Sequence, residues 1–318
     1  MVTPQHHIPA PPGKPWPRGL FSAAALLDDL REGADGTWVT DACATGAVLP
    51  YCGAGRPAPG PKSFDMSNWL TATPFVVQAG FNCNAVGVYD AREHAERALA
   101  AIEQRLVEQT IWRGLGGAAS LAEGADDVSG EVPVALVDAI AALEGELAAR
   151  TGHVGVIHAP AKLGAMLTSQ QIAAVGADGV LRTALGTAVV LGAGYDGFAP
   201  DGSAPVDGDG NTGVVLYATG PVAVHRQAAP IVNGGDPDGF HTRLNTIQGL
   251  AERGYMVAAD CPRLKAAAYW PSTSGTPGHT PLKAPANLTL TPDTTSVHAK
   301  WDVVEGASDY VLTITKDS

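Results

Sequence analysis

Lysine and charge are scarce in this sequence. Seven of its 318 residues are lysine, charged residues make up 16% of the chain, and the formal net charge is −12. Sequence-independent binding to nucleic acid depends on clustered lysine and arginine side chains that neutralise phosphates. The composition therefore argues against a dedicated nucleic-acid-binding module.

Long hydrophobic runs are missing as well. No stretch approaches the about 18 consecutive apolar residues that a membrane-spanning helix needs. Residues 1–19 contain no apolar segment behind basic residues, which a signal peptide requires. We therefore expect no membrane span and no secretion signal, and we expect the chain to be made in the cytoplasm of a host cell.

Cysteine is rare and its spacing is uninformative. The four cysteines show no CxxC pattern and have too few neighbouring histidines for a zinc site: Cys43, Cys52, Cys83 and Cys261. Because disulfides are rare in a reducing compartment, we expect small buried or half-buried thiols. A Cys43–Cys52 bridge is the alternative.

The sequence also lacks a recognisable catalytic set. No GxSxG elbow is present, and the histidines fit no metal or triad spacing. We interpret them as surface residues or satisfied core residues: His6, His7, His153, His158, His225 and His241. We expect no catalytic, cofactor-binding or metal-binding residue, and therefore no enzyme.

One glycine-rich segment comes close to a nucleotide-binding motif. Gly192, Gly194 and Gly197 spell GxGxxG after an expected strand. A dinucleotide site needs a helix to begin there, so that its N-terminus faces the pyrophosphate, but residues 198–213 read as a loop. We favour a loop between two strands. An α+β enzyme or ligand-binding protein that uses this segment is the alternative.

A second segment, DGDGNTG, begins like a calcium loop at Asp207, Asp209 and Asn211. The sixth and twelfth positions of such a loop should be glycine and glutamate, but here they are Thr212 and Ala218. A glycine-rich turn between strands is favoured over a weak surface cation site.

The most informative stretch is an alternating strand over residues 74–88 that is followed by an amphipathic helix ending at Gly114. One helix face should be buried, with Ala95, Leu99, Ile102 and Leu106. The charged residues should stay exposed: Glu96, Arg97, Glu103, Arg105 and Glu108. About twenty residues at 1.5 Å each make a rod of roughly 30 Å, which suits a scaffold.

The segments before that strand are rich in proline and glycine. Six prolines within residues 1–18 forbid helix and favour an extended arm that either dangles or lies on a neighbour. A short helix is expected at Leu20–Leu30. Residues 37–65 have little periodicity, and so long a loop in a compact domain is usually functional or intersubunit.

The second half of the chain predicts an α+β domain. Pro133 should open a helix that ends at Gly152, with a buried stripe of Leu136, Ile140, Leu143 and Leu147. Strands are expected within residues 154–160, 181–195, 213–227 and 253–260, and a short helix at 160–167.

From Pro271 the composition changes to a proline, serine, threonine and glycine linker. Residues 285–318 then alternate as three short strands, which resembles the start of a fibronectin type III domain with Trp301 in its core. A complete sandwich needs about 100 residues. We expect this part to be a truncated domain, to pack on the main body, or to pair with another chain.

The order of an extended N-terminal region, a strand, a long helix and an α+β domain resembles the tailed-phage major capsid proteins and the related encapsulin shell proteins. The helix closes on a pattern E-x-R-x₆-W-x-G, formed by Glu103, Arg105, Trp112 and Gly114. In this family the helix is the spine of a peripheral domain, an N-arm and an E-loop reach over neighbouring subunits, and an axial domain closes the capsomer.

The resemblance implies an α+β capsid fold with six segments. These are an N-terminal arm (1–35), an E-loop-like region (36–75), a peripheral domain with the spine helix (76–135), an axial domain with return strands (136–270), a linker (271–284) and a partial fibronectin or immunoglobulin-like β extension (285–318). Lys62 lies in the E-loop-like region, where some relatives carry a crosslinking lysine; a solvated loop lysine is the simpler interpretation. Trp112 is expected to anchor the core.

The implied function is structural. The chain would form homo-pentamers and homo-hexamers of an icosahedral virion shell around double-stranded DNA, assembled in the host cytoplasm. A shell need not be basic throughout, so the acidic composition is compatible with DNA packaged without sequence-specific binding. Portal, scaffold or decoration proteins are the other expected partners, and no membrane is. An encapsulin-type nanocompartment is the alternative within the same fold.

Overall fold

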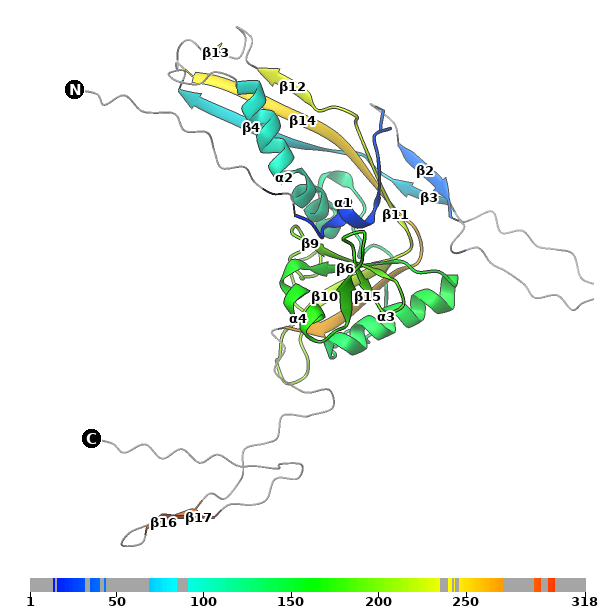
Figure 1. Cartoon of the computed structure of the whole chain (residues 1–318), viewed down its shortest axis with the longest axis vertical. Coiled ribbons are helices and arrows are strands. Elements are labelled where there is room, and N and C mark those ends of the chain that lie inside the picture. Colours follow the sequence, from blue (N-terminus) through cyan, green and yellow to red (C-terminus); the bar gives the residue numbers. More distant parts are fainter. Residues whose placement is uncertain are drawn as a thin grey trace, which may run out of the picture. The chain divides into compact units, whose positions relative to one another are not determined.

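The structure, a computed structural model, describes residues 14, 16–31, 35–40, 43, 69–84, 91–234, 240–241, 243, 246–270, 289–292 and 297–300. The chain divides into two units, Met1–Trp270 and Pro271–Ser318 (Figure 1). Among the described helices, none has both the length and the apolar character needed to cross a bilayer.

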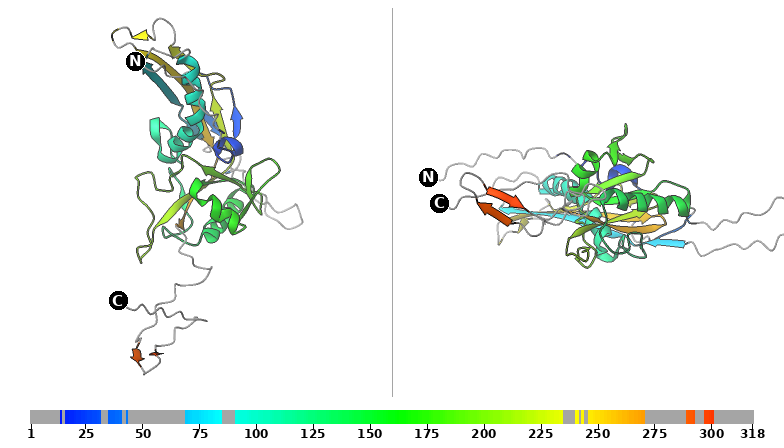
Figure 2. Two further views of the ribbon diagram at one scale, coloured as in Figure 1. Left: turned by 60° about the vertical axis from the view of Figure 1, so that its left-hand side comes forward. Right: turned by 90° about the horizontal axis from the view of Figure 1, so that it is seen from below.

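The first sheet of the larger unit is built on two long strands, β4 (Phe75–Asn84) and β14 (Thr246–Ala259). They pair antiparallel along the whole of β4, from Phe75 opposite Tyr255 to Asn84 opposite Thr246. Helix α2 (Ala91–Arg113) runs along this pair in both Figure 1 and Figure 2. Four more strands complete the sheet: β1 (Ala25–Leu27), β11 (Val222–Arg226), β12 (Ile231–Gly234) and β13 (Phe240–His241).

Helix α2 packs against β4 because both carry apolar residues on one side, as predicted. Phe75, Val77 and Ala79 are buried, whereas the intervening residues of β4 are exposed. From the helix, Ala95 and Leu99 are buried in the same core. A strand with one apolar face and a helix with one apolar stripe can each hide that surface only against the other.

The second sheet has seven strands. In spatial order they are β5 (Asp126–Asp127), β15 (Arg263–Tyr269), β10 (Gly213–Thr219), β6 (Val156–Pro160), β9 (Ala188–Gly192), β8 (Leu181–Thr183) and β7 (Ala173–Val175). Helix α3 (Leu136–Thr151) covers one face with the predicted stripe of four leucine and isoleucine residues, all buried. It ends at Gly152, which has a positive φ of 67°, as predicted. The short helices η2 (Ala161–Leu163) and α4 (Gly164–Ser169) follow β6.

The central strands of this sheet separate two hydrophobic cores. Val215 and Tyr217 of β10 belong to the core that contains α2, whereas Val214 and Leu216 belong to the core beneath α3. Every residue of β10 is buried, because a strand covered on both faces has no solvent side. The α+β fold class predicted from the sequence is confirmed.

Two smaller pairs of strands complete the described structure. Strands β2 (Gly36–Val39) and β3 (Trp69–Ala72) pair antiparallel, and we call this pair the ribbon. The smaller unit contains β16 (Thr289–Pro292) paired with β17 (Val297–Lys300). Residues 1–13, most of the E-loop-like region with Lys62, the linker, Trp301 and the third predicted strand lie outside the described residues.

The helix predicted at Leu20–Leu30 is wrong beyond its first turn. Helix α1 spans only Leu20–Ala23, and the chain then becomes extended as β1, which pairs parallel with β11. The Asp28 carboxylate accepts a hydrogen bond from Arg226 at 2.5 Å, and Asp29 contacts His225 at 2.7 Å. A short apolar run does not distinguish helix from strand, so the available sheet edge decided the outcome.

The prediction of free thiols is wrong for two cysteines. Cys43 is joined to Cys261 by a disulfide. The two residues are 218 positions apart, so no local spacing pattern pointed to the pair. Cys52 lies outside the described residues.

Candidate functional site

The residues that the sequence singled out meet where the C-terminal half of α2 lies against the second sheet. We call this group the junction; it consists of residues 103–113 of α2, the loop 193–200 between β9 and β10, and residues 16–20. Whereas the first half of α2 is amphipathic, Val107, Ile111 and Trp112 in its second half are all buried. The junction is therefore the place where the two sheets are joined through one helix.

Glu108 is the centre of the junction, and the prediction that it is exposed is wrong. Its side chain is fully buried and accepts hydrogen bonds from the Leu20 N–H at 2.8 Å, the Gly194 N–H at 2.9 Å and the Gln104 amide at 3.0 Å. Burial raises the pKa of the Glu108 carboxyl, while these donors act in the opposite direction. The carboxylate links the N-terminal segment, the helix and the loop.

The GxGxxG segment forms the loop of the junction, as favoured from the sequence. No helix begins after it, because β9 leads through the loop to β10. A nucleotide phosphate would need free backbone N–H donors in this loop. The Gly194 N–H is already used, because it donates a hydrogen bond to the Glu108 carboxylate. A side chain at Gly194 would lie 2.2 Å from the Arg105 carbonyl oxygen and 2.5 Å from the Gln109 nitrogen. Glycine is needed here for close approach to the helix.

Replacing Gly194 with alanine is therefore expected to destabilise the protein by about 1–3 kcal/mol, because the helix backbone must move away from the loop. Gly208 offers a matched control, since an added Cβ at that position meets nothing within 4 Å. Gly208→Ala should leave stability unchanged or raise it by up to about 1 kcal/mol. Urea denaturation of both variants measures the difference, and equal midpoints would contradict this account of Gly194.

Trp112 anchors the core, as predicted. It is fully buried, its indole N–H donates to the Phe198 carbonyl oxygen at 2.8 Å, and its ring centroid lies 4.7 Å from that of Tyr195 and 4.8 Å from that of Tyr217. Aromatic pairs at these separations contribute beyond the burial of their area. The tryptophan thus holds helix, loop and sheet together.

Two further residues at the C-terminal end of α2 fix the helix to the loop or end it. Arg113 donates to the Asp196 carboxylate and, at 2.8 Å, to the Ala199 carbonyl oxygen, which ties the helix end to the loop. Gly114 ends the helix with a positive φ of 70°. Arg105 is exposed, as predicted.

Glu103, also predicted to be exposed, is largely buried and joins α2 to β14. Its Oε2 accepts a hydrogen bond from the Tyr255 hydroxyl at 2.5 Å and forms an ion pair with Arg253 at 3.0 Å. Only 15% of its side chain is accessible. Periodicity misplaced Glu103 and Glu108 because it counts polarity on one helix face and carries no information about partners on another strand.

His158 is a satisfied core residue, one of the two interpretations that the sequence allowed. Its Nδ1 lies 3.1 Å from the Tyr195 hydroxyl, and its Nε2 lies 3.1 Å from Thr219 Oγ1. The Thr219 hydroxyl donates to the Gly220 carbonyl, so Nε2 carries the proton and Nδ1 accepts from Tyr195. Burial lowers the pKa of His158 to about 3, so the ring is neutral.

The DGDGNTG segment is a turn in which the carboxylate of Asp207 is occupied by the chain itself. It accepts hydrogen bonds from the N–H groups of Asp209 and Asn211 and from the Tyr269 hydroxyl. Among the described residues, no group of three or more histidine, cysteine or acidic side chains is arranged to hold a metal.

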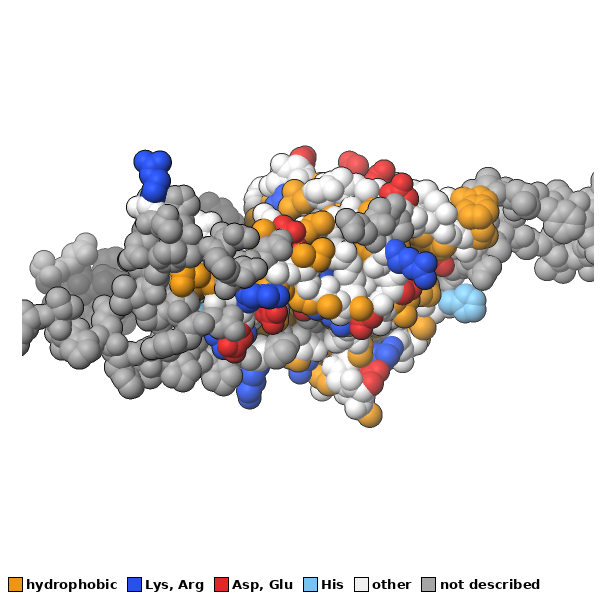
Figure 3. All heavy atoms as spheres, turned by 90° about the horizontal axis from the view of Figure 1, so that it is seen from above, with side chains coloured by type: hydrophobic (Ala, Val, Ile, Leu, Met, Phe, Trp, Pro, Cys, Tyr) orange, Lys and Arg blue, Asp and Glu red, His pale blue; other side chains and the backbone are white. Residues whose placement is uncertain are grey.

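A hollow beside the end of α2 offers little for catalysis. Its lining includes Phe75, Ile111, Leu121 and Val257, and Arg263 is the one ionisable residue among the lining residues that the structure describes. On the face drawn in Figure 3, acidic and basic side chains of the described residues are interspersed with apolar ones. Neither feature brings together an acid, a base and a nucleophile.

Comparisons with known proteins give structural neighbours only. No family model matches the sequence, and no curated protein matches it. A chain of the cyanophage Pam1 capsid asymmetric unit is 12% identical and has a TM-score of 0.52, covering 84% of this chain and 96% of its own.

Two further neighbours have the same extent. The capsid of a native GTA particle, computed with C5 symmetry, is 13% identical with a TM-score of 0.52, covering 84% of this chain and 95% of that one. A chain of Mycobacterium phage Ogopogo is 14% identical with a TM-score of 0.51, covering 84% and 96%. At such identities the similarity establishes the fold, so the capsid fold predicted from the sequence is confirmed.

Proposed function

We propose that this chain is the major capsid protein of a tailed bacteriophage. The observation that carries the proposal is the extent of the fold similarity: a capsid chain of cyanophage Pam1 matches over 96% of its length, and a GTA capsid chain over 95%. Almost nothing of those shell chains is without a counterpart here. The role is structural, and assembly in the host cytoplasm would place the protein in the virion.

The division of labour follows from the fold. Helix α2 serves as the spine of the peripheral domain (76–135), because 23 residues at 1.5 Å each give a rod of about 35 Å. The junction couples this rod to the axial domain (136–270). The arm (1–35) and the E-loop-like region (36–75) reach neighbouring subunits in homo-pentamers and homo-hexamers, where repeated interfaces supply the stability.

DNA is enclosed without being bound tightly in this proposal. Seven lysines and a net charge of −12 supply few phosphate contacts. The mixed charges in Figure 3 support the same interpretation. Portal, scaffold or decoration proteins are the further partners we propose.

The C-terminal extension is proposed to be a partial fibronectin-like or immunoglobulin-like element that decorates the shell. Support comes from the antiparallel pairing of β16 and β17, in which Leu290 lies opposite Ala299. This register joins two of the three strands in which the sequence alternates.

Electron microscopy of the purified chain after size-exclusion chromatography tests the proposed function. We expect closed particles, or rings of five and six subunits, because a shell subunit needs only copies of itself to form capsomers. A uniform monomer or dimer under all assembly conditions tried would contradict the proposal. Particles that hold a protein cargo and exclude DNA would favour the encapsulin-type alternative.

A further inference from the structure

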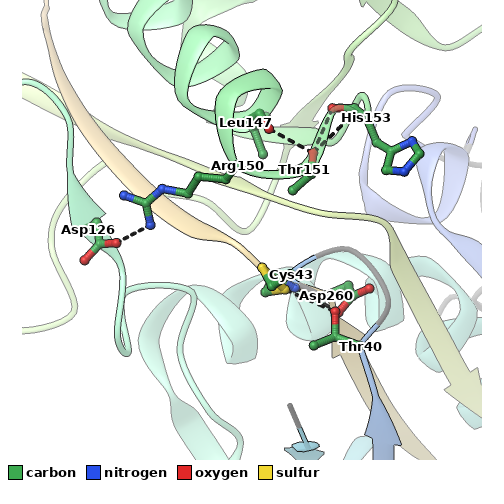
Figure 4. Close-up of a disulfide and its surroundings, with 9 residues drawn as sticks. Thr40, Cys43, Asp126, Leu147, Arg150, Thr151, His153 and Asp260 are labelled. Carbon is green, nitrogen blue, oxygen red and sulfur yellow. Dashed lines mark hydrogen bonds and ion pairs between the residues drawn. A yellow bond between two sulfur atoms is a disulfide. The ribbon is translucent and has the colours of Figure 1, made fainter. Parts of the chain in front are cut away.

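The Cys43–Cys261 disulfide joins two parts of the chain that differ in how firmly they are held. Cys261 lies two residues after the end of β14, and Cys43 lies four residues after the end of β2. Figure 4 shows the bond between the ribbon side of the chain, marked by Thr40, and the turn marked by Asp260. The disulfide can control only the segment that is weakly attached to the rest of the chain by other contacts.

The Cys261 side is anchored. The Gly220 N–H donates to the Asp260 carbonyl oxygen at 3.0 Å, and the Asp260 N–H donates to the Pro221 carbonyl oxygen at 2.9 Å. A Cβ at Gly220 would lie 2.3 Å from the Cys261 carbonyl oxygen, so the turn sits directly on the β10–β11 corner. The turn is thereby fixed to both sheets without help from the disulfide.

The ribbon, on the Cys43 side, depends more on the disulfide than the Cys261 turn does. Among the described residues, the ribbon of β2 and β3 is a sheet of two strands, and so small a sheet gains little stability from its own pairing. Trp69 and Val39 lie opposite each other in the ribbon and are 58% and 53% exposed, so this pair contributes little burial. The Thr40 hydroxyl, which is buried, donates to Cys261 Sγ at 3.1 Å and closes the contact beside the bond.

We propose that Cys43 and Cys261 form a redox-controlled tether that fixes the β2–β3 ribbon to the β14–β15 turn. In a reducing compartment the two residues are thiols and the ribbon is held by non-covalent contacts alone. Oxidation by a disulfide donor such as oxidised glutathione joins the two sulfurs and passes two protons and two electrons to the donor, whose own disulfide breaks so that it leaves as two thiols. The ribbon is then covalently attached.

The timing of this step rests on the proposed shell function. A capsid subunit folds and assembles in a reducing cytoplasm and leaves it when the cell lyses, so the tether would close in the finished particle. The tether itself is a property of the single chain, and it can be tested whether or not particles form.

Thiol counting and hydrogen exchange on the purified chain test the tether. After exposure to oxidised glutathione, alkylation in denaturant should label two of the four cysteines, and peptide mapping should place the bond at Cys43 and Cys261. Adding a reductant should raise amide exchange in β2 and β3 by tenfold or more through local opening of the ribbon, whereas exchange in β10 should change only as far as global stability does. The Tm should fall by roughly 5–15 °C.

Variants separate the tether from general effects of the reductant. Cys43→Ser and Cys261→Ser should each exchange like the reduced protein and no longer respond to reductant, whereas Cys52→Ala should respond like the wild type. If a variant fails to fold, the reductant series on the wild type still decides the result. Labelling of all four cysteines after oxidation, or identical ribbon exchange in both redox states, would overturn the proposal.

Discussion

Replacing Trp112 with alanine is expected to cost about 3–5 kcal/mol of stability, which is typical of truncating a buried aromatic side chain. The substitution removes the stacking with Tyr195 and the edge-to-face contact with Tyr217, and it leaves the Phe198 carbonyl oxygen without its donor. Because α2 is common to both sheets, the loss should appear as a shift of the whole unfolding transition. Chemical denaturation monitored by far-UV circular dichroism measures it.

Trp69 provides the matched control. Its side chain is 58% exposed on the ribbon, so Trp69→Ala should change stability by no more than about 0.5 kcal/mol. If both tryptophan variants unfold at the same denaturant concentration, Trp112 is not the anchor described here. A changed m-value for Trp112→Ala alone would indicate that the two sheets unfold separately.

Acidification is expected to destabilise the protein through His158 by about 2 kcal/mol between pH 6.5 and pH 4.5. Its pKa is about 3 in the folded protein and 6.5 when unperturbed, so the unfolded chain binds more protons in this interval. Stability is therefore fully present above pH 6.5 and falls with pH by up to about 1.4 kcal/mol per unit. The total approaches about 5 kcal/mol only below pH 3.

Denaturation curves recorded from pH 8 to pH 4.5 measure this loss. His158→Gln keeps a donor and an acceptor between Tyr195 and Thr219 but does not titrate, so its stability should depend much less on pH. Glu108 acts with the opposite sign, because its raised pKa favours protonation in the fold as pH decreases. Equal pH slopes for His158→Gln and the wild type would show that His158 does not drive the acid response.

Much of the fold was predictable because its elements are local and periodic. The stripe of α3, the end of that helix at Gly152 and the alternation of β4 all follow from a repeat that a single element must satisfy. Trp112 was predictable as an anchor from its size alone. The helix predicted at Leu20–Leu30 failed because the decisive partner, β11, is almost two hundred residues away.

The junction was only partly predictable. Its glycine loop and the helix pattern around Trp112 stood out, and a loop between strands was favoured there over a nucleotide site, but nothing in the GxGxxG spacing indicated that Gly194 lies against the helix. The roles of Glu108 and Glu103 could not be foreseen, since polarity places such residues at the surface. Two polar residues five positions apart on a long, otherwise amphipathic helix were the available signal, and it is a weak one.

The sequence by itself determined the class of the protein: a mixed α+β chain with a long rod-like helix, few phosphate-binding side chains and no recognisable catalytic motif. These properties depend on composition and on repeats within single elements. Only the tertiary structure decided that Glu108 joins Leu20 to Gly194, that His158 stays neutral between two hydroxyls, and that Cys43 is bonded to Cys261. Each of these depends on residues from separate elements meeting in space, and a linear pattern contains no information about which distant groups will desolvate together.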